Sequence, residues 1–454
     1  MINRRVLAST LALTATLLVP FSYPAFAATL DVGPQKPFSK IEDAVAKAQP
    51  GDLILVHPRE GGQAYERVAV MVRKKNLTFR AAPAVDNKRI ALSGQGFNYT
   101  GAGSTPRAIF QFDPGADGCL LEGFDLTRAH NDSHNGAGVR INQASRVTIR
   151  NCSIHHNDMG IMSNGDGTPS TGLDQRIETC EIHHNGDPAE PGQNHNLYLG
   201  GTSVTVSGCE IHHSLTGHNL KSRAHHTRVE YCYLHDSANR EFDLVDAADT
   251  ARPDSDAVLL GNIIVKDDNC PGNRTVIHFG QDGGKGHDGT LHLAFNTIVT
   301  PFMAPLIDLS APGAKARLVG NLVSNGGTRQ AGQQIATVRN DAKLESVSGM
   351  HNWFSGDFTA SAKALQPGLD ALTNRLERAA FPLFRNPAKP DYSLTPEAAK
   401  MAVTPLSREK IELPPVPGRP AADTEPPLSW QYHHPAGKTK RPAEPQLTLG
   451  AYTR

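Results

Sequence analysis

Four segments of the sequence share one local pattern: IRNCSIHHN (149–157), IETCEIHHN (177–185), VSGCEIHHS (206–214) and VEYCYLHDS (229–237). In each segment an apolar residue is followed by a cysteine three positions later and by a second apolar residue two positions after that. The pattern continues, with asparagine in the cysteine position, in LLGNII (259–264), LAFNTI (293–298) and LVGNLV (318–323). Successive copies lie 23 to 34 residues apart. A repeat of this length with short apolar segments predicts a solenoid in which each copy forms one coil.

The short apolar runs are typical of strands, and the three-and-four spacing of an amphipathic helix is missing. Parallel strands stacked about 4.8 Å apart place like residues above like. The cysteines are therefore expected to form a buried ladder of reduced thiols, with disulfides as the alternative for an exported protein. The paired histidines predict a stack of rings at a turn, and a zinc site is the alternative.

The N-terminus is typical of a secretory signal peptide over residues 1–27. Arg4 and Arg5 precede the apolar stretch VLASTLALTATLLV (6–19), and Ala25-Phe26-Ala27 matches a cleavage site. We expect cleavage near Ala27 and a periplasmic or secreted protein, with a retained anchor as the alternative. No later segment is long enough to span a bilayer as a helix.

The two ends of the mature chain differ from the repeats. PFSKIEDAVAKAQPGDLILVHP (37–58) predicts a capping helix followed by the first strand, with Ser39 and Glu42 as a capping box. The coils are expected to extend over residues 28–400. The proline-rich segment 401–454 is expected to wrap along the outside of the solenoid, and a free disordered tail is the alternative.

The helix cap, the PGDLILVHPREG entry (50–61) and the coils resemble the pectate-lyase-like right-handed parallel β-helix superfamily. The resemblance implies an all-β fold, a single-stranded right-handed parallel β-helix. It implies less about activity, because one fold hosts many functions.

A second strand follows each repeat, in HNLYL (195–199), HNLKS (218–222) and REFDL (240–244). Alternation predicts that Leu197, Leu220 and Phe242 point inward. The outward set then comprises Asn196, Asn219 and Glu241, the column Tyr198, Lys221 and Asp243, and the strand starts His195, His218 and Arg240. Arg223, Arg140 and His278 are expected on the same face. We interpret this face as a carbohydrate groove.

These side chains suit cleavage of a uronate polysaccharide by β-elimination, which needs a cation to neutralise the carboxylate, a base and an acid. Lys221 is the expected base, because Arg223 and Arg240 would oppose a further positive charge. Tyr198 or His218 is the expected acid. Glu241 and Asp243 are oxygen ligands suited to Ca²⁺. Substrate contacts are expected from Asn196, Asn219, Arg223, His195, Arg140 and His278.

The NLKS strand (219–222) also resembles the alginate lyase and chondroitinase B group of β-helix lyases. That resemblance implies Lys221 as the base, Arg240 as the acid, and calcium held by Asn and Glu side chains. A C5-epimerase, a glycoside hydrolase and a glycan-binding β-helix remain alternatives. The chain carries 45 basic and 45 acidic residues, so nucleic acid is not an expected partner, and we expect a monomer that binds an acidic polysaccharide.

Overall fold

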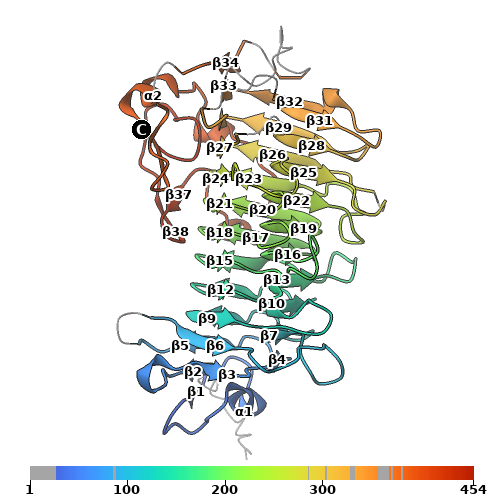
Figure 1. The fold of residues 1–454 in the computed structure, drawn as a ribbon, viewed down its shortest axis with the longest axis vertical. Helices are drawn as coiled ribbons and strands as arrows, with labels where there is room; N and C mark the ends of the chain where they lie inside the picture. The colour runs from blue at the N-terminus through green and yellow to red at the C-terminus, as the bar shows by residue number, and fades with distance from the viewer. Residues whose placement is uncertain are drawn as a thin grey trace, which may run out of the picture.

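The structure is a computed structural model that describes residues 27–84, 88–284, 286–301, 304–327, 333–355, 368–369, 372–379 and 382–453. The predicted signal peptide, apart from Ala27, lies outside the described residues. Three parallel sheets, here called A, B and C, run along one elongated stack of coils (Figure 1). Most coils pass through A, then B, then C, and continue into the strand of A above.

Sheet A contains β1 (Thr29–Val32), β2 (Leu53–Val56), β5 (Thr78–Ala81), β8 (Leu120–Glu122), β11 (Thr148–Arg150), β14 (Gln175–Glu178), β17 (Ser203–Ser207), β20 (His226–Glu230), β23 (Ala257–Leu260), β26 (Thr290–Ala294), β29 (Lys315–Val319) and β32 (Val347–Met350). Sheet B contains β3 (Tyr65–Glu66), β6 (Ile90–Ser93), β9 (Phe124–Thr127), β12 (Ser153–His155), β15 (Glu181–His183), β18 (Glu210–His212), β21 (Tyr233–His235), β24 (Ile263–Val265), β27 (Thr297–Val299), β30 (Leu322–Ser324), β33 (Trp353–Ser355) and β34 (Arg375–Glu377). Sheet C contains β4 (Val70–Val72), β7 (Ala108–Phe112), β10 (Ala137–Asn142), β13 (Met159–Asn164), β16 (Leu197–Leu199), β19 (Leu220–Ser222), β22 (Phe242–Val245), β25 (Ile277–Gly280), β28 (Ile307–Leu309) and β31 (Ala336–Val338).

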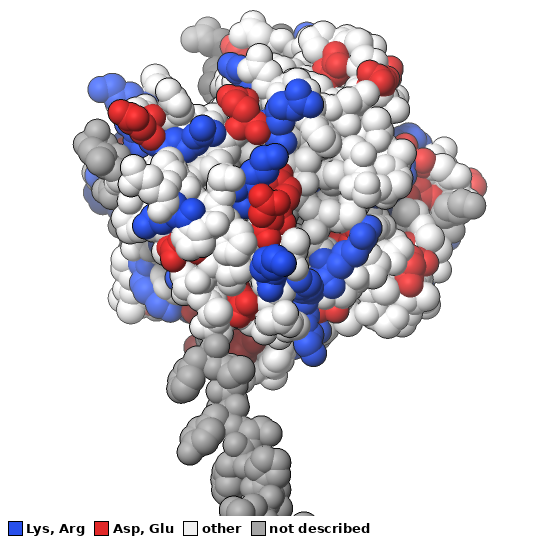
Figure 2. Space-filling view, turned by 90° about the horizontal axis from the view of Figure 1, so that it is seen from below, with Lys and Arg blue, Asp and Glu red and all other residues white. Residues whose placement is uncertain are grey.

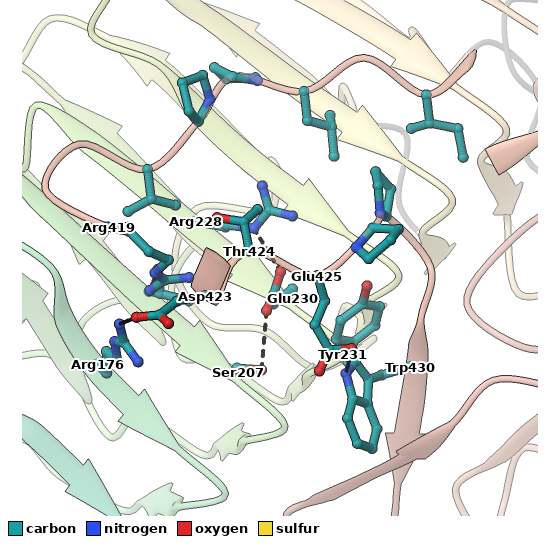
Figure 3. Close-up of a pocket in the computed structure, with 18 of the residues that line it drawn as sticks. Arg176, Ser207, Arg228, Glu230, Tyr231, Arg419, Asp423, Thr424, Glu425 and Trp430 are labelled. Atoms are coloured by element: carbon teal, nitrogen blue, oxygen red, sulfur yellow. Dashed lines mark hydrogen bonds and ion pairs between the residues drawn. The ribbon is translucent and has the colours of Figure 1, made fainter. Parts of the chain in front are cut away.

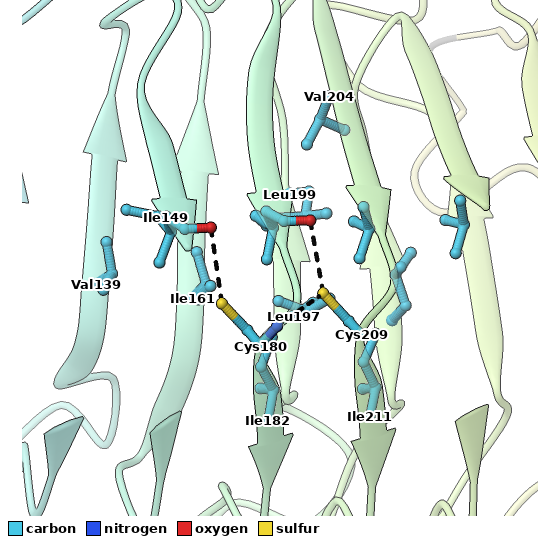
Figure 4. Close-up of a cluster of buried hydrophobic side chains, with 14 of the residues drawn as sticks. Val139, Ile149, Ile161, Cys180, Ile182, Leu197, Leu199, Val204, Cys209 and Ile211 are labelled. Atoms are coloured by element: carbon cyan, nitrogen blue, oxygen red, sulfur yellow. Dashed lines mark hydrogen bonds between the residues drawn. The ribbon is translucent and has the colours of Figure 1, made fainter. Parts of the chain in front are cut away.

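The predicted cysteine ladder is confirmed at the corner between sheets A and B. Cys152, Cys180, Cys209 and Cys232 are free, fully buried and stacked, and the backbone N–H of each of the first three donates to the sulfur of the next cysteine. Figure 4 shows Cys180 and Cys209 of this ladder among apolar side chains of the core. The stack then passes into asparagines, because the Cys232 N–H donates to Asn262 Oδ1 over 2.9 Å. Asparagine suits this corner because its amide satisfies backbone groups of neighbouring coils.

The predicted stack of histidine rings is also confirmed, at the corner between sheets B and C. His155, His183, His212 and His235 lie nearly parallel, with centroids 4.8–4.9 Å apart. The second histidine of each pair forms a parallel stack of its own. Ring stacking therefore extends the coil-to-coil contacts outside the apolar core.

The N-terminal cap is a short helix, α1 (Ile41–Lys47), which buries Ile41 and Ala44 against the first coils. The predicted capping box is wrong, because the helix begins one residue later, with Lys40 at the N-cap and no side-chain cap. Glu42 instead accepts a hydrogen bond from the backbone N–H of Ala69 over 2.8 Å. That bond ties the cap to the solenoid.

The parallel coils end at β34, before the expected boundary at residue 400. The chain then forms the hairpin β35 (Phe384–Asn386) and β36 (Asp391–Leu394), the helix α2 (Pro396–Met401), and the hairpin β37 (Trp430–His433) and β38 (Gly437–Lys440). Residues 401–453, here called the tail, lie beside sheet B in Figure 1, away from the labelled strands of sheet C. The described tail bonds to sheets A and B: Arg419 Nη2 donates to Thr205 Oγ1 of β17 over 2.9 Å, and Tyr432 Oη donates to Glu210 Oε2 of β18 over 3.1 Å.

Acidic and basic side chains are mixed on the N-terminal end of the molecule, which faces the viewer in Figure 2. Among the described residues, no helix has the length and apolar character needed to cross a membrane.

Candidate active site

The outward residues of sheet C form one column along the solenoid. The strand register places Lys221 beside Tyr198 on one side and Asp243 on the other, as predicted. His278 lies on the next strand in line with Asp243, and Arg140 lies two strands before Tyr198. In chain order the column is Met71, Gln111, Arg140, Met162, Tyr198, Lys221, Asp243, His278, Asp308 and Thr337.

Lys221 lies between two carboxylates. Its Nζ is 3.2 Å from Asp243 Oδ2 and 2.5 Å from Asp282 Oδ2. Arg223 Nη2 lies 2.6 Å from the same Asp282 oxygen. Burial alone would raise the pKa of Asp282, but the hydrogen bonds from Lys221 and Arg223 lower it below its ordinary value. Two carboxylates therefore offset the positive charge that Arg223 was expected to place beside Lys221.

Asp243 is the buried hub of the site, with a side chain that is 4% exposed. Its Oδ1 lies 2.7 Å from His278 Nδ1 and 3.3 Å from Arg240 Nη1, and its Oδ2 lies 3.4 Å from His218 Nε2. Burial opposes ionisation, but the hydrogen bond from His278 and the neighbouring positive groups hold the pKa of Asp243 well below its usual range. Asp243 thus supplies one fixed negative charge within the column.

His195 and His218 support the column from beneath rather than facing a ligand. They are 3% and 5% exposed, and their rings stack at 5.0 Å. The backbone N–H of His218 donates to His195 Nδ1, and that of Arg240 donates to His218 Nδ1. Burial and the charges of Arg240 and Lys221 outweigh the pull of Asp243 and lower the pKa of His218 to about 4. His218 is therefore a neutral ring with its proton on Nε2, which does not fit the expected role as an acid.

His278 is buried in a hydrogen-bonded network. Its Nε2 lies 2.8 Å from Arg339 Nη2 and 2.6 Å from Ser310 Oγ. Because a guanidinium can only donate, Nε2 accepts and the ring proton lies on Nδ1, facing Asp243. His278 has the predicted register, but it is only 3% exposed and orients Asp243. The expectation that it contacts substrate directly does not fit this burial.

Asn196, Asn219 and Glu241 point inward, so the expectation that they face the groove is wrong. All three are 0% exposed and belong to a ladder at the corner before sheet C. Asn196 donates to Asn219 Oδ1 over 2.8 Å, and Asn219 donates to Glu241 Oε2 over 2.6 Å. Glu241 Oε1 lies 3.6 Å from Lys266 Nζ, also within the fold.

The two carboxylates expected to hold Ca²⁺ do not fit that ion. Calcium needs several oxygen ligands directed at one point. Asp243 is contacted by Lys221, Arg240 and two imidazoles, while Glu241 faces the buried Lys266. Positive groups already occupy the space that the ion would need, and calcium has no part in the chemistry proposed below.

The accessible groups of the site are several cations, one phenol and the carboxylate of Asp282. The Arg223 guanidinium lies over the Tyr198 ring, 5.4 Å from its centroid. The side chains of Arg223 and Arg240 are 34% and 16% exposed. Arg140 donates to Asn164 Oδ1 over 3.3 Å farther along the same face. A ligand on sheet C therefore meets Tyr198, these arginines and the pair of Lys221 with Asp282 first.

Comparison with known proteins identifies the architecture. The family described as "Right handed beta helix region" matches residues 133–298. The chain is a right-handed parallel β-helix. Among solved structures, pectate lyase Pel9A shares 15% identity over 94% of this chain and 96% of that chain, with a TM-score of 0.53. The alginate lyase from Paenibacillus sp. str. FPU-7 shares 14% identity over 78% of this chain and 99% of that chain, with a TM-score of 0.45. The DFA-IIIase from Arthrobacter chlorophenolicus A6 without its lid shares 13% identity over 79% of this chain and 100% of that chain, also with a TM-score of 0.45.

No curated protein matches the chain in sequence. At 15% identity, the likeness to the pectate lyase establishes a shared fold, and the activity of this β-helix has to be argued from its own side chains.

Three groups of the site were not predicted from the sequence. Asp282 follows β25 in a glycine-rich loop, where no repeat register applies. Arg339 follows β31, and its Nε lies 3.0 Å from Asp308 Oδ2. Asp308 itself was accessible to sequence reasoning, because it occupies the outward position of DLS (308–310), one strand beyond His278.

A cavity of about 440 Å³ lies elsewhere on the β-helix, between the outer face of sheet A and the tail (Figure 3). Its charged side chains pair among themselves or with neighbouring residues: Arg228 Nε lies 2.7 Å from Glu230 Oε2, and Arg176 Nη2 lies 2.6 Å from Asp174 Oδ2. Trp430 Nε1 donates to Glu425 within the tail. Other contacts cross from the tail to the coils: Arg419 pairs with Asp174 at 2.8 Å, and Lys438 Nζ donates to Ser207 Oγ over 2.9 Å. We assign the cavity to this seam.

Proposed function

We propose that the β-helix is an exported enzyme that cleaves an acidic, uronate-containing polysaccharide by β-elimination on the outer face of sheet C. One observation carries the proposal: a single carboxylate, that of Asp282, binds both Lys221 and Arg223 through one oxygen. A uronate carboxylate has the same charge and geometry. It is suited to replace Asp282 on these two cations.

The column also suits a polymer that lies along the solenoid axis. Successive parallel strands are about 4.8 Å apart, which is close to the length of one sugar unit. Tyr198, Lys221 and the more distant Arg140 lie in one line over four successive strands. A polysaccharide in this direction presents about one sugar to each strand.

In the proposed reaction Arg223 takes the uronate carboxylate, since its planar donors match a carboxylate better than a lysine does. Lys221, released from Asp282, is the proposed acceptor of the C5 proton. The electron pair forms the C4–C5 double bond and expels the C4 oxygen. Tyr198 protonates that oxygen, since a phenol releases its proton far more readily than the guanidinium of Arg240.

The decisive experiment is a panel of uronate polysaccharides assayed for both unsaturated-uronate absorbance and new reducing ends. A lyase produces the two signals together. Reducing ends without the chromophore identify a hydrolase, a changed sugar configuration without cleavage identifies an epimerase, and binding alone identifies a glycan-binding protein. Each of these three results contradicts the proposal.

The role of Lys221 is tested with Lys221→Ala. Loss of a general base is expected to lower kcat by about 10²- to 10⁴-fold with little change in KM, and Lys221→Arg is not expected to restore it. A rise in KM with kcat retained would make Lys221 a carboxylate anchor instead. Lys315→Ala removes an exposed lysine from β29 of sheet A and is the matched control.

A further inference from the structure

The histidine stack ends in a cluster of nitrogen and oxygen ligands that the chemistry of sheet C does not use. In three coils a pair of adjacent histidines joins Nδ1 to Nδ1 over 2.7–2.8 Å, as in His212 and His213. In the fourth coil the second histidine is replaced by Asp236, which follows His235. The replacement brings a carboxylate to the exposed end of a stack of imidazoles.

The ligand atoms of His213, His235 and Asp236 lie within 4.8 Å of one another. Asp236 Oδ2 is 2.7 Å from His235 Nδ1 and 3.6 Å from His213 Nε2. Tetrahedral zinc with bonds of about 2.0–2.1 Å needs ligand atoms roughly 3.3 Å apart. We infer that His213, His235 and Asp236 bind a divalent transition metal, with zinc as the best-matched ion.

The surroundings already orient both imidazoles for this role. His213 Nδ1 is hydrogen-bonded to His212, and His235 Nε2 lies 3.3 Å from Glu210 Oε1. Glu210 Oε2 in turn accepts from Tyr432 Oη over 3.1 Å, from β37 of the tail. A carboxylate or acceptor behind each metal-binding histidine fixes its ring and tautomer, and is typical of protein zinc sites.

The side chains of His213 and Asp236 are 46% and 34% exposed, so that an ion can enter and keep a water ligand. Two imidazoles select a borderline metal over Ca²⁺ or Mg²⁺, which prefer oxygen ligands. The arrangement that competes with the metal is an ion triad, in which a protonated His235 lies between Asp236 and Glu210. The experiment has to separate these two states.

The test is titration of the mature protein, freed of metals by chelation, with zinc alone, followed by calorimetry and metal analysis. We expect one zinc per chain. Asp236→Asn and His213→Asn are each expected to weaken binding at least tenfold, and Glu210→Gln about 10- to 100-fold. Asparagine is chosen because both positions have positive φ, 54° and 50°, which it tolerates.

The matched control is His156→Asn, which changes an exposed histidine at the same turn position two coils earlier, with φ 53°. This control is expected to bind zinc like the wild type. No stoichiometric uptake by the wild type would overturn the inference in favour of the ion triad. Equal losses in His156→Asn and His213→Asn would overturn it in favour of adventitious binding to surface histidines. Neither result depends on the polysaccharide activity.

Discussion

Replacing Asp282 with asparagine should make the protein bind its substrate more tightly. In the free protein Asp282 pairs with Lys221 at 2.5 Å and with Arg223 at 2.6 Å, and an entering uronate must break both pairs. The side chains are 12%, 34% and 36% exposed for Lys221, Arg223 and Asp282, so solvent screens the pairs in part. Pairs of this kind contribute about 0.2–1 kcal/mol each, and the two together about 0.4–2 kcal/mol.

Because about 1.4 kcal/mol corresponds to a tenfold change in affinity, Asp282→Asn should lower the Kd for a uronate oligosaccharide about 2- to 30-fold. The same substitution removes the two pairs from the free protein, so its Tm should fall slightly. The assay is calorimetric titration with the oligosaccharides that the wild type releases from its polysaccharide. A control with the same change in charge is Asp43→Asn, at an exposed position of α1.

An unchanged or weaker affinity in Asp282→Asn would refute the reasoning. It would mean that the uronate does not take the place of the Asp282 carboxylate. The proposed function would then need a different anchor for the substrate, even if the polysaccharide panel had shown eliminative cleavage.

Four further predictions concern the rest of the molecule. Arg140 lies three strands, roughly 14 Å, from Lys221. In the calorimetric titration, Arg140→Met should therefore weaken the binding of long oligosaccharides several-fold and leave the affinity for dimers and trimers unchanged. A calcium-selective chelator should leave cleavage and Tm unchanged, whereas a loss of cleavage that added Ca²⁺ restores would show that the site needs calcium. Burial and neighbouring histidines lower the pKa of His183 to about 3 and that of His184 to about 4, against 6.5 in the unfolded chain. Because the unfolded chain takes up protons first as the pH falls, Tm should fall as the pH drops from about 6.5 towards 4. A Tm that stays constant over this range would contradict the prediction. Thiol titration of the denatured, unreduced protein should find all six cysteines free, and disulfides would contradict the ladder.

Sequence alone predicted the coils and the central column of the site, because both depend on strand periodicity. Leu197, Leu220 and Phe242 point inward in register, so Tyr198, Lys221 and Asp243 follow from alternation. In the coils that carry the cysteine and histidine ladders, like residues stack on like, so the repeat in the sequence predicts the stack directly.

The errors lie at the corners of the coils. The strands of sheet C begin at Leu197, Leu220 and Phe242, so the residue before each of them belongs to the turn. Alternation does not hold through a turn, and Asn196, Asn219 and Glu241 point inward although the strand pattern predicts the reverse. Asp282 could not be predicted, because a loop without a repeat carries no register that links it to Lys221.

The attachment of the tail changes how the solenoid should unfold. Coils that contact only their neighbours form a nearly one-dimensional stack, which can fray from either end. Here Arg419, Leu428 and Ala451 bond to coil residues that are 245, 197 and 154 positions away in the chain. Such distant contacts make separate coils depend on one another, and they slow folding because the last residues made must return to coils formed much earlier. Because the tail holds several coils together, we expect the whole molecule to melt in one cooperative step although it is a repeat protein.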